Sequence, residues 1–178
     1  METITFSPAQ IHILNLVSHI KSPTGLELLK EQLSEFYAKQ IDHGMRQVVI
    51  DTNCLLQIIS LHSPYRPIWE AFLQRKFTLC VSNEILEEYQ EILEEQTTAR
   101  IAENIILLIL NKKNVSFIDP YFRMNLIVED PDDNKFVDCA FAANADYLVS
   151  EDHHFKILES IPFPKLNLVT MDMFLQSI

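Results

Sequence analysis

Residues 129–152 read EDPDDNKFVDCAFAANADYLVSED, and this stretch decides the fold class. Its middle part, residues 134–144, is amphipathic and predicts a helix, and the apolar run of residues 147–149 follows almost at once. A short, continuous apolar run is typical of a strand that is buried on both faces of a parallel sheet. A helix that leads directly into such a strand predicts an α/β fold.

The same alternation extends over the rest of the chain from residue 46 onward. Further strands are predicted at residues 47–50, 77–81, 115–118 and 166–169. Further helices are predicted at residues 67–75, 83–95, 98–112 and 171–177. Strands that alternate with helices predict a three-layer α/β/α architecture with a mostly parallel central sheet.

The first 45 residues have a different texture and predict a helical hairpin. Residues 7–10, SPAQ, form an N-terminal capping pattern ahead of apolar residues at helical spacing, and a similar pattern recurs at residues 24–27. Gly44 suits the position just past a helix end. We therefore expect a hairpin extension at 1–45 and an α/β domain at 46–178. The hairpin either extends the core or has a regulatory role: it covers a cleft or supports a dimer.

Composition limits the classes of function. The 178 residues, 48% of them hydrophobic, suit one globular domain with a small appendage. The two glycines lie outside the glycine-rich patterns of a P-loop or a dinucleotide site. The net charge of −11 argues against a broad basic face for nucleic acid, so any such role must depend on local charge or on bound metal.

Cysteine usage and hydropathy indicate the compartment. Cys54, Cys80 and Cys139 are too few and too scattered for a disulfide framework, so we expect buried free thiols. The longest aliphatic run, residues 105–110, is far shorter than the roughly 20 residues that span a membrane. The N-terminus has no basic flank or cleavage site. We therefore expect a cytoplasmic protein without a membrane partner.

Acidic residues follow two of the predicted strands. VVIDTN places Asp51 directly after the first strand, with Thr52 and Asn53 beside it, and YLVSED places Ser150 and Asp152 after another. In an open α/β sheet, ligands bind beyond the carboxyl ends of the strands. A lone aspartate at a strand end is more often a turn residue or a helix cap. Two at equivalent strand ends favour a functional site.

The helical segment SNEILEEYQEILEEQ contains six glutamates, most of which belong to a solvated face. On a helical projection, Ile85, Tyr89 and Leu93 lie in the core stripe, and Glu88 lies nearer to that stripe than the other glutamates do. Glu88 is therefore the glutamate that we expect at the edge of a cleft.

The densest acidic segment adds further candidates. Asp132 and Asp133 are candidate caps of the helix that follows, and Asp133 can cap it while it presents a carboxylate to the same cleft. Asp138 falls in the middle of that helix, between Val137 and Cys139, which favours a structural or supporting role over direct contact with a metal.

Carboxylates that are brought together repel one another, and their burial without a partner is costly. A bound divalent cation removes that cost. Mg²⁺ and Mn²⁺ prefer oxygen ligands and bridge protein carboxylates to substrate phosphate. Such an ion polarises the phosphoryl group, activates water and stabilises the leaving oxygen, and two ions would share these roles. The residues therefore favour phosphodiester hydrolysis with Mg²⁺ or Mn²⁺.

Four segments together resemble the PIN-domain nucleases, especially the toxin components of bacterial toxin–antitoxin pairs. These segments are VVIDTN (48–53), VSNEILEEYQEIL (81–93), DPDDNKFVDCAFAANADYLVSED (130–152) and LNLVTMDMFL (166–175). The resemblance implies a metal-dependent endoribonuclease of compact α/β fold at 46–178. It also implies a single-stranded or structured RNA substrate, a homodimer, and an antitoxin protein that inserts into the active cleft. A third regulatory role for the hairpin at 1–45 is to stand in for part of such an antitoxin.

The resemblance assigns roles to individual residues. It implies that Asp51, Glu88, Asp133 and Asp152 are the catalytic acids and the metal ligands, with Asn53 and Ser150 as their polar supports. Glu151 stands where the family often has glycine or another small or polar residue.

Basic side chains near these acids are candidates for contacts to phosphate. His153 and His154 follow Asp152 directly, although surface histidines at the start of a helix are equally common. Lys135 is a further candidate for a phosphate contact. Lys156, Arg66 and Arg123 are the other basic residues considered for an RNA path.

Two other classes of function stay open. The acidic surface and Glu151 are compatible with a catalytically inactive PIN-like module that binds protein or RNA. A phosphatase that uses an aspartate after its first strand usually has a second aspartate two residues later. Here that position is Asn53, which makes this class the weakest of the three.

Overall fold

The computed structural model describes residues 45–161 and 165–178. The predicted hairpin at 1–45 lies outside the described residues, except for Met45, and stays a prediction together with its domain boundary. The strands are β1 (Arg46–Ile50), β2 (Phe77–Val81), β3 (Val115–Phe117), β4 (Tyr147–Val149) and β5 (Leu168–Val169). The helices are α3 (Thr52–Ile59), α4 (Arg66–Leu73), α5 (Asn83–Gln96), α6 (Ala99–Leu110), α7 (Asn134–Ala142) and α8 (Met171–Ser177), with 3₁₀ segments η1 (Pro131–Asp133) and η2 (His153–Ser160).

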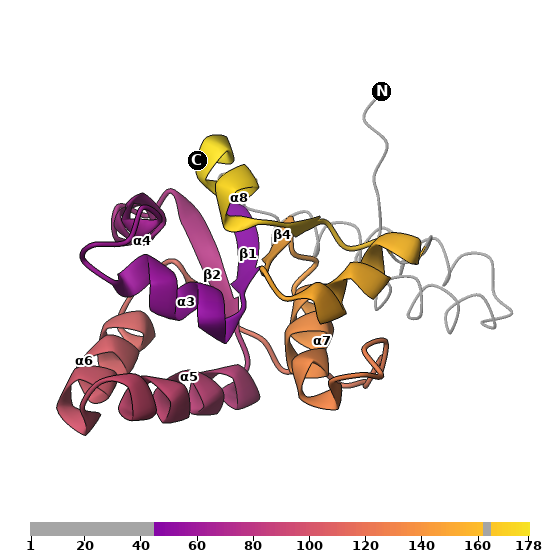
Figure 1. Ribbon diagram of the computed structural model, residues 1–178, viewed down its shortest axis with the longest axis horizontal. Helices are drawn as coiled ribbons and strands as arrows, with labels where there is room; N and C mark the ends of the chain where they lie inside the picture. Colours follow the sequence, from indigo (N-terminus) through magenta and orange to yellow (C-terminus); the bar gives the residue numbers. More distant parts are fainter. Residues whose placement is uncertain (1–44, 162–164) are drawn as a thin grey trace, which may run out of the picture. The chain divides into compact units, whose positions relative to one another are not determined.

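The five strands form one parallel sheet in the order β3-β2-β1-β4-β5. β1 lies at the centre, and Ile50 pairs with Val149 where β1 and β4 end. Helices pack against the sheet: α7 contacts β1, β2 and β4, and α4 contacts β2, whereas α5 packs mainly against α6 and α3 (Figure 1). The predicted α/β fold with a mostly parallel sheet is confirmed.

The connections between strands explain the layers. The chain passes from β1 through β2 to β3 in one direction, by way of α3 to α6, and then returns across the sheet through α7 to β4. Because such crossovers are right-handed, the outward and return connections cover opposite faces of the sheet. The last helix, α8, closes the core: the ring of Phe174 lies 5.2 Å from that of Phe77 and 5.8 Å from that of Tyr147.

Hydrophobic burial and side-chain caps account for most of these elements. β2 is buried along its whole length, as expected of a continuous apolar run. The side chains of Ser82, Thr98 and Thr170 accept hydrogen bonds from backbone N–H groups at the starts of α5, α6 and α8. The three cysteines are buried and free, which confirms the prediction.

The helix α3 is the main element that the sequence did not reveal. Asp51 precedes it in an extended conformation and makes no side-chain capping bond to it, so the usual start signal is missing. In the described part of the chain, no helix is long and apolar enough to cross a membrane.

Candidate metal centre

The order of the strands places a site between β1 and β4. The chain leaves β1 towards β2 on one side, whereas β4 adjoins β1 on the other, so the strand order reverses at this point. Ligand sites of open α/β sheets lie at such switch points, beyond the carboxyl ends of the strands. Asp51 follows β1, and Ser150 and Asp152 follow β4. The backbone N–H of Asp51 donates to the carbonyl oxygen of Val149, at 3.0 Å.

A short chain of hydrogen bonds links the two strand ends. The hydroxyl of Ser150 donates to Oδ2 of Asp51 at 2.9 Å, and the backbone N–H of Asp152 donates to the Ser150 hydroxyl at 3.0 Å. Ser150 is buried, and Asp51 is only 4% exposed. Ser150 therefore orients the Asp51 carboxylate and ties it to the segment that carries Asp152.

The electrostatics of Asp51 are unfavourable for a charged group. Burial raises the pKa of Asp51 to about 6, and the charges of Glu88 and Asp152 add to the rise. The hydrogen bond from Ser150 and the nearby backbone N–H of Asn53 lower the pKa, but less than burial raises it. Asp51 is therefore a buried carboxylate that shares its surroundings with other acids.

Glu88 comes to this site on α5. The next residue, Tyr89, is fully buried and donates its hydroxyl to the carbonyl oxygen of Ile50, which fixes α5 against the end of β1. The Thr52 hydroxyl donates to Oε1 of Glu88 at 2.5 Å, and the ammonium of Lys135 lies 2.5 Å from Oε2. Ile85 and Leu93 are buried, so the other glutamates of α5 lie on its exposed side. They are exposed, as the helical projection predicted: Glu84, Glu87, Glu91, Glu94 and Glu95.

Asp133 ends η1, just before α7. Burial is the largest cause that raises its pKa to about 7, and the charges of Asp130, Asp51 and Asp152 contribute, whereas His154 lowers it. Its Oδ2 atom is shielded from solvent and has no hydrogen-bond partner among the described residues. A buried carboxylate oxygen without a partner is costly, so this atom has an unused capacity to bind a cation.

Two nearby acids have structural roles. Asp138 is fully buried and accepts the backbone N–H of Met124 at 2.8 Å, while Arg123 lies 3.5 Å from its other oxygen. It therefore fastens the loop before η1 to α7, in agreement with the structural role favoured above. Glu151 accepts the backbone N–H of Met171 at 2.8 Å, at the start of α8. Its carboxylate is used there, although Asp152 follows it directly in sequence.

The other predicted side chains lie around the acids. His153 and His154 begin η2, with Nδ1 atoms 3.2 Å and 3.1 Å from Oδ1 of Asp152. Asn53 is exposed, and among the described residues no side-chain hydrogen bond joins it to the acids. Sequence reasoning missed that Thr52 supports Glu88; a hydroxyl directly after the strand-end acid was the available signal.

Three of the four basic residues considered for an RNA path already have partners, and the partner of Lys135 belongs to the candidate site. Lys135 pairs with Glu88, and Arg123 pairs with Glu84 and Asp138. Arg66 donates to the carbonyl oxygen of Ile59. Lys156 is exposed.

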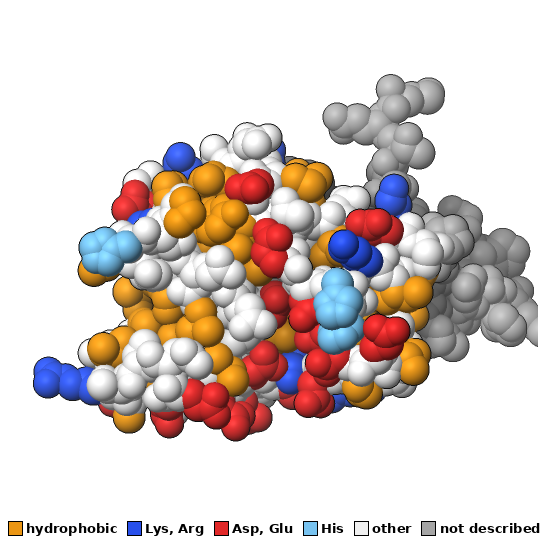
Figure 2. All heavy atoms as spheres, in the orientation of Figure 1, with side chains coloured by type: hydrophobic (Ala, Val, Ile, Leu, Met, Phe, Trp, Pro, Cys, Tyr) orange, Lys and Arg blue, Asp and Glu red, His pale blue; other side chains and the backbone are white. Residues whose placement is uncertain are grey.

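The donor set fits a hard divalent cation. The charges of Glu88 and Asp152 act on Asp51, those of Asp51 and Asp152 act on Asp133, and all the ligand atoms are oxygens. Among the described residues, no three of the four acids bring ligand oxygens within 4.8 Å of one another. Figure 2 shows acidic side chains gathered around a histidine patch on this face of the molecule. A cation bound among these oxygens would offset the repulsion and the desolvation that raise the two pKa values.

Comparison with known families is consistent with this geometry. A family model described as "PIN domain" matches residues 47–154, which include all four acids. The chain belongs to the PIN-domain family. The predicted resemblance to PIN-domain nucleases is therefore confirmed. A second model, a family of unknown function, matches residues 1–54.

Several solved structures are similar to this PIN domain to different degrees. VapBC2 from Rickettsia felis, bound to a promoter DNA fragment, is 18% identical with a TM-score of 0.51, and the match covers 70% of this chain and 98% of that one. DNA-bound VapBC from Salmonella typhimurium is 15% identical with a TM-score of 0.49 and coverages of 71% and 99%. The PIN-domain endonuclease Utp24 is 17% identical with a TM-score of 0.44 and coverages of 70% and 84%. The first likeness supports the fold alone, and no curated protein matches.

Proposed function

We propose that this PIN domain is a metal-dependent endoribonuclease that hydrolyses RNA phosphodiester bonds. In this proposal Asp51, Glu88, Asp133 and Asp152 hold Mg²⁺ or Mn²⁺. The observation that carries the proposal is the electrostatic coupling of these acids at a topological switch point: Asp51 responds to Glu88 and Asp152, and Asp133 responds to Asp51 and Asp152. Carboxylates that raise one another's pKa in this way are typical of functional sites.

A bound divalent cation supplies charge stabilisation for the phosphoryl group and an activated water for hydrolysis. The protein's own residues orient the site. Ser150 directs Oδ2 of Asp51, and Thr52 together with Lys135 holds the Glu88 carboxylate. His153, His154 and Lys135 are the side chains that we propose to contact phosphate. In hydrolysis the oxygen of a water molecule forms a new P–O bond and loses a proton, while the P–O bond to the leaving oxygen breaks and that oxygen takes a proton.

RNA is the substrate class that we propose, because the family resemblance implies a ribonuclease. The charge of −11 and the exposed glutamates of α5 disfavour binding along an extended nucleic-acid face. We therefore expect short contacts to one single-stranded or exposed stretch of a structured RNA, rather than strong binding to bulk nucleic acid.

Partners are proposed on the same basis. We propose a homodimer and an antitoxin protein that covers the acidic cleft with a basic segment. A cationic side chain of such a partner would satisfy the Asp133 oxygen that has no hydrogen-bond partner in the described chain. Light scattering of the purified protein, alone and with the product of an adjacent gene, measures both assemblies.

A second candidate function, an inactive PIN-like interaction module, is favoured by one contact. Lys135 lies 2.5 Å from Glu88 and neutralises one of the four acids without any metal. If Lys135 replaces the cation permanently, the fold is kept and hydrolysis is lost. Calorimetry with Mn²⁺ distinguishes the two functions, because the inactive module would not bind the ion.

The decisive experiment is a cleavage assay on a mixed RNA panel with Mn²⁺, Mg²⁺ or EDTA. Wild type is compared with Asp51→Asn and with Glu91→Gln, a control on the exposed face of α5. We expect cleavage that requires metal, is lost in Asp51→Asn and is kept in Glu91→Gln. Full activity in Asp51→Asn would refute the proposed roles. Failure of the folded wild type to bind metal would leave the interaction module.

A further inference from the structure

Beside the four acids lies a second group of metal-ligating side chains that contains nitrogen. Asp130, Asp133 and His154 each offer one ligand atom, and the three atoms lie within 4.8 Å of one another. All three residues are half-buried. A neighbouring group, Glu129, His153 and His154, meets the same criterion, but Glu129 and His153 are exposed.

Two atoms of the first group are buried and have no hydrogen-bond partner within the described residues. They are Nδ1 of His154 and Oδ2 of Asp133, and they lie 3.8 Å apart. Nδ1 is also 3.1 Å from Oδ1 of Asp152, which accepts the backbone N–H of His154 at 2.9 Å, but this contact does not have the geometry of a hydrogen bond. Buried polar atoms are almost always bonded, so two such atoms that face each other require an explanation.

Charge around His154 is strongly negative. Asp130, Asp133, Asp152 and Glu129 surround it, and in the described part of the chain no lysine or arginine forms an ion pair with any of them. Lys135 and Arg123, which come from the same region, are paired with Glu88, Glu84 and Asp138 instead. The group therefore has no fixed cation of its own.

We propose that Asp130, Asp133 and His154 form a subsite for a first-row divalent transition-metal ion, of which Mn²⁺ is the probe. The imidazole nitrogen makes the subsite selective against Mg²⁺, which strongly prefers oxygen, because first-row transition-metal ions accept imidazole, the heavier ones more readily than Mn²⁺. Because Asp133 belongs to both sets, the subsite rests on the proposed function and adds a metal preference to it.

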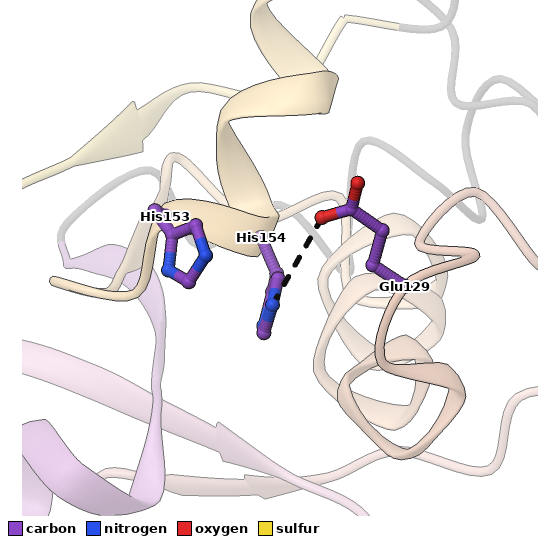
Figure 3. Close-up of side chains that lie close together, drawn as sticks. All are labelled: Glu129, His153 and His154. Atoms are coloured by element: carbon purple, nitrogen blue, oxygen red, sulfur yellow. Dashed lines mark ion pairs between the residues drawn. The ribbon is translucent and has the colours of Figure 1, made fainter.

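The surroundings orient the imidazole for this role. Figure 3 shows the His154 ring between His153 and Glu129, with its Nε2 atom 4.0 Å from the Glu129 carboxylate. A metal-binding histidine usually engages a carboxylate with its other ring nitrogen, which fixes the ring and increases its basicity. Glu129 is placed to serve in this way when Nδ1 binds the ion. Oδ1 of Asp130 accepts the backbone N–H of Asp132 at 3.3 Å, and its other oxygen stays available.

The test measures nitrogen coordination directly, without RNA. The protein is loaded with Mn²⁺, and its pulsed electron paramagnetic resonance spectrum is examined for coupling to ¹⁴N. We expect coupling in the wild type and in His62→Gln, a control on an exposed histidine, and none in His154→Gln. We also expect His154→Gln to weaken Mn²⁺ binding at this subsite about tenfold, while Mg²⁺ binding changes little.

A second variant guards against loss of folding. Asp130→Asn keeps an oxygen for the Asp132 N–H and leaves His154 intact, so it should fold and still weaken Mn²⁺ binding. Absence of ¹⁴N coupling in the wild type, or its persistence in folded His154→Gln, overturns the proposal and leaves His154 as an ion-pair partner of Asp152.

Asp51→Asn separates this inference from the proposed nuclease. The variant removes an acid that the subsite does not use, so ¹⁴N coupling should persist while RNA cleavage is lost. Cleavage that needs Asp51 without any ¹⁴N coupling would refute the subsite alone. Coupling without metal-dependent cleavage would refute the nuclease alone.

Discussion

Replacement of Asp51 by asparagine should stabilise the metal-free protein, although it removes a proposed catalytic acid. The pKa of Asp51 is raised from 3.8 to about 6, chiefly by burial. Each unit of pKa corresponds to about 1.4 kcal/mol, so the charged carboxylate costs the folded state about 3 kcal/mol. Asparagine removes that charge and keeps an oxygen that accepts the Ser150 hydroxyl.

The dependence on pH identifies the cause. The folded state holds the Asp51 proton more tightly than the unfolded state does, so the penalty is small near pH 4, at about 0.5 kcal/mol. It grows as the pH rises from 4 to 6 and is complete above the folded-state pKa of about 6. Asp51→Asn should therefore raise the free energy of unfolding by up to about 3 kcal/mol at pH 8 and hardly at all at pH 4.

Urea unfolding in EDTA measures this difference. Trp69, the one tryptophan, is buried in α4, so its fluorescence reports loss of the core. Glu91→Gln, on the exposed face of α5, is the matched control and should change the stability by less than about 0.5 kcal/mol. Mn²⁺ should reverse the order, because the ion stabilises only the protein that binds it. The electrostatic reasoning fails if the variant is less stable at pH 8, or if the gain is equal at pH 4 and pH 8.

Three further predictions concern the same region. Mn²⁺ affinity should increase from pH 5.5 to pH 8 by calorimetry, because protons compete for Asp51 and for Asp133, whose pKa values are about 6 and about 7; equal affinity at both pH values contradicts this. Tyr89→Phe should lower the free energy of unfolding by about 1–2 kcal/mol in urea, since the Ile50 carbonyl loses its buried donor; an unchanged midpoint would show that this bond adds nothing. Asp138→Ala should cost about 1–3 kcal/mol, because the Met124 N–H loses its acceptor, yet it should leave Mn²⁺ affinity within about twofold; a large loss of affinity would make Asp138 a ligand.

The fold could be predicted wherever the local pattern was unambiguous. β2, β4 and α8 have the predicted bounds, because each is a short apolar or amphipathic run between clear breaks. α3 could not be recognised, since Asp51 directly follows the strand β1 and the helix begins at the next residue without a capping bond. β5 is shorter than predicted, and only Leu168 and Val169 pair with β4.

The candidate site could be predicted in part. The periodicity of α5 identified Glu88, and the strand ends identified Asp51 and Asp152. The sequence could not establish that β1 and β4 are neighbours, since the pairing joins residues about a hundred positions apart. The orientation of the Glu151 side chain could not be predicted either, because it depends on a hydrogen bond from the backbone N–H of Met171, which is distant in sequence. Long-range pairing decides such features, and no local pattern encodes it.

The contrast between acids that have a backbone N–H or a basic side chain as partner and acids that face other acids is the strongest guide to function in this molecule. Asp138 and Glu151 accept backbone N–H groups, and Asp138 also has Arg123 nearby, so both contribute to the fold itself. Asp138 and Asp133 each have one buried oxygen without a hydrogen-bond partner in the described residues, and burial raises the pKa of both. The difference lies in their neighbours: Asp138 faces the Arg123 guanidinium, whereas the charges of Asp130, Asp51 and Asp152 add to the rise at Asp133. An acid that lowers the stability of the metal-free protein and supports no local structure is best explained by a ligand that binds to it. Nδ1 of His154 is likewise buried without a hydrogen-bond partner in the described residues. A bound metal ion would explain this atom as well, and the proposed subsite shares Asp133 with the proposed nuclease site.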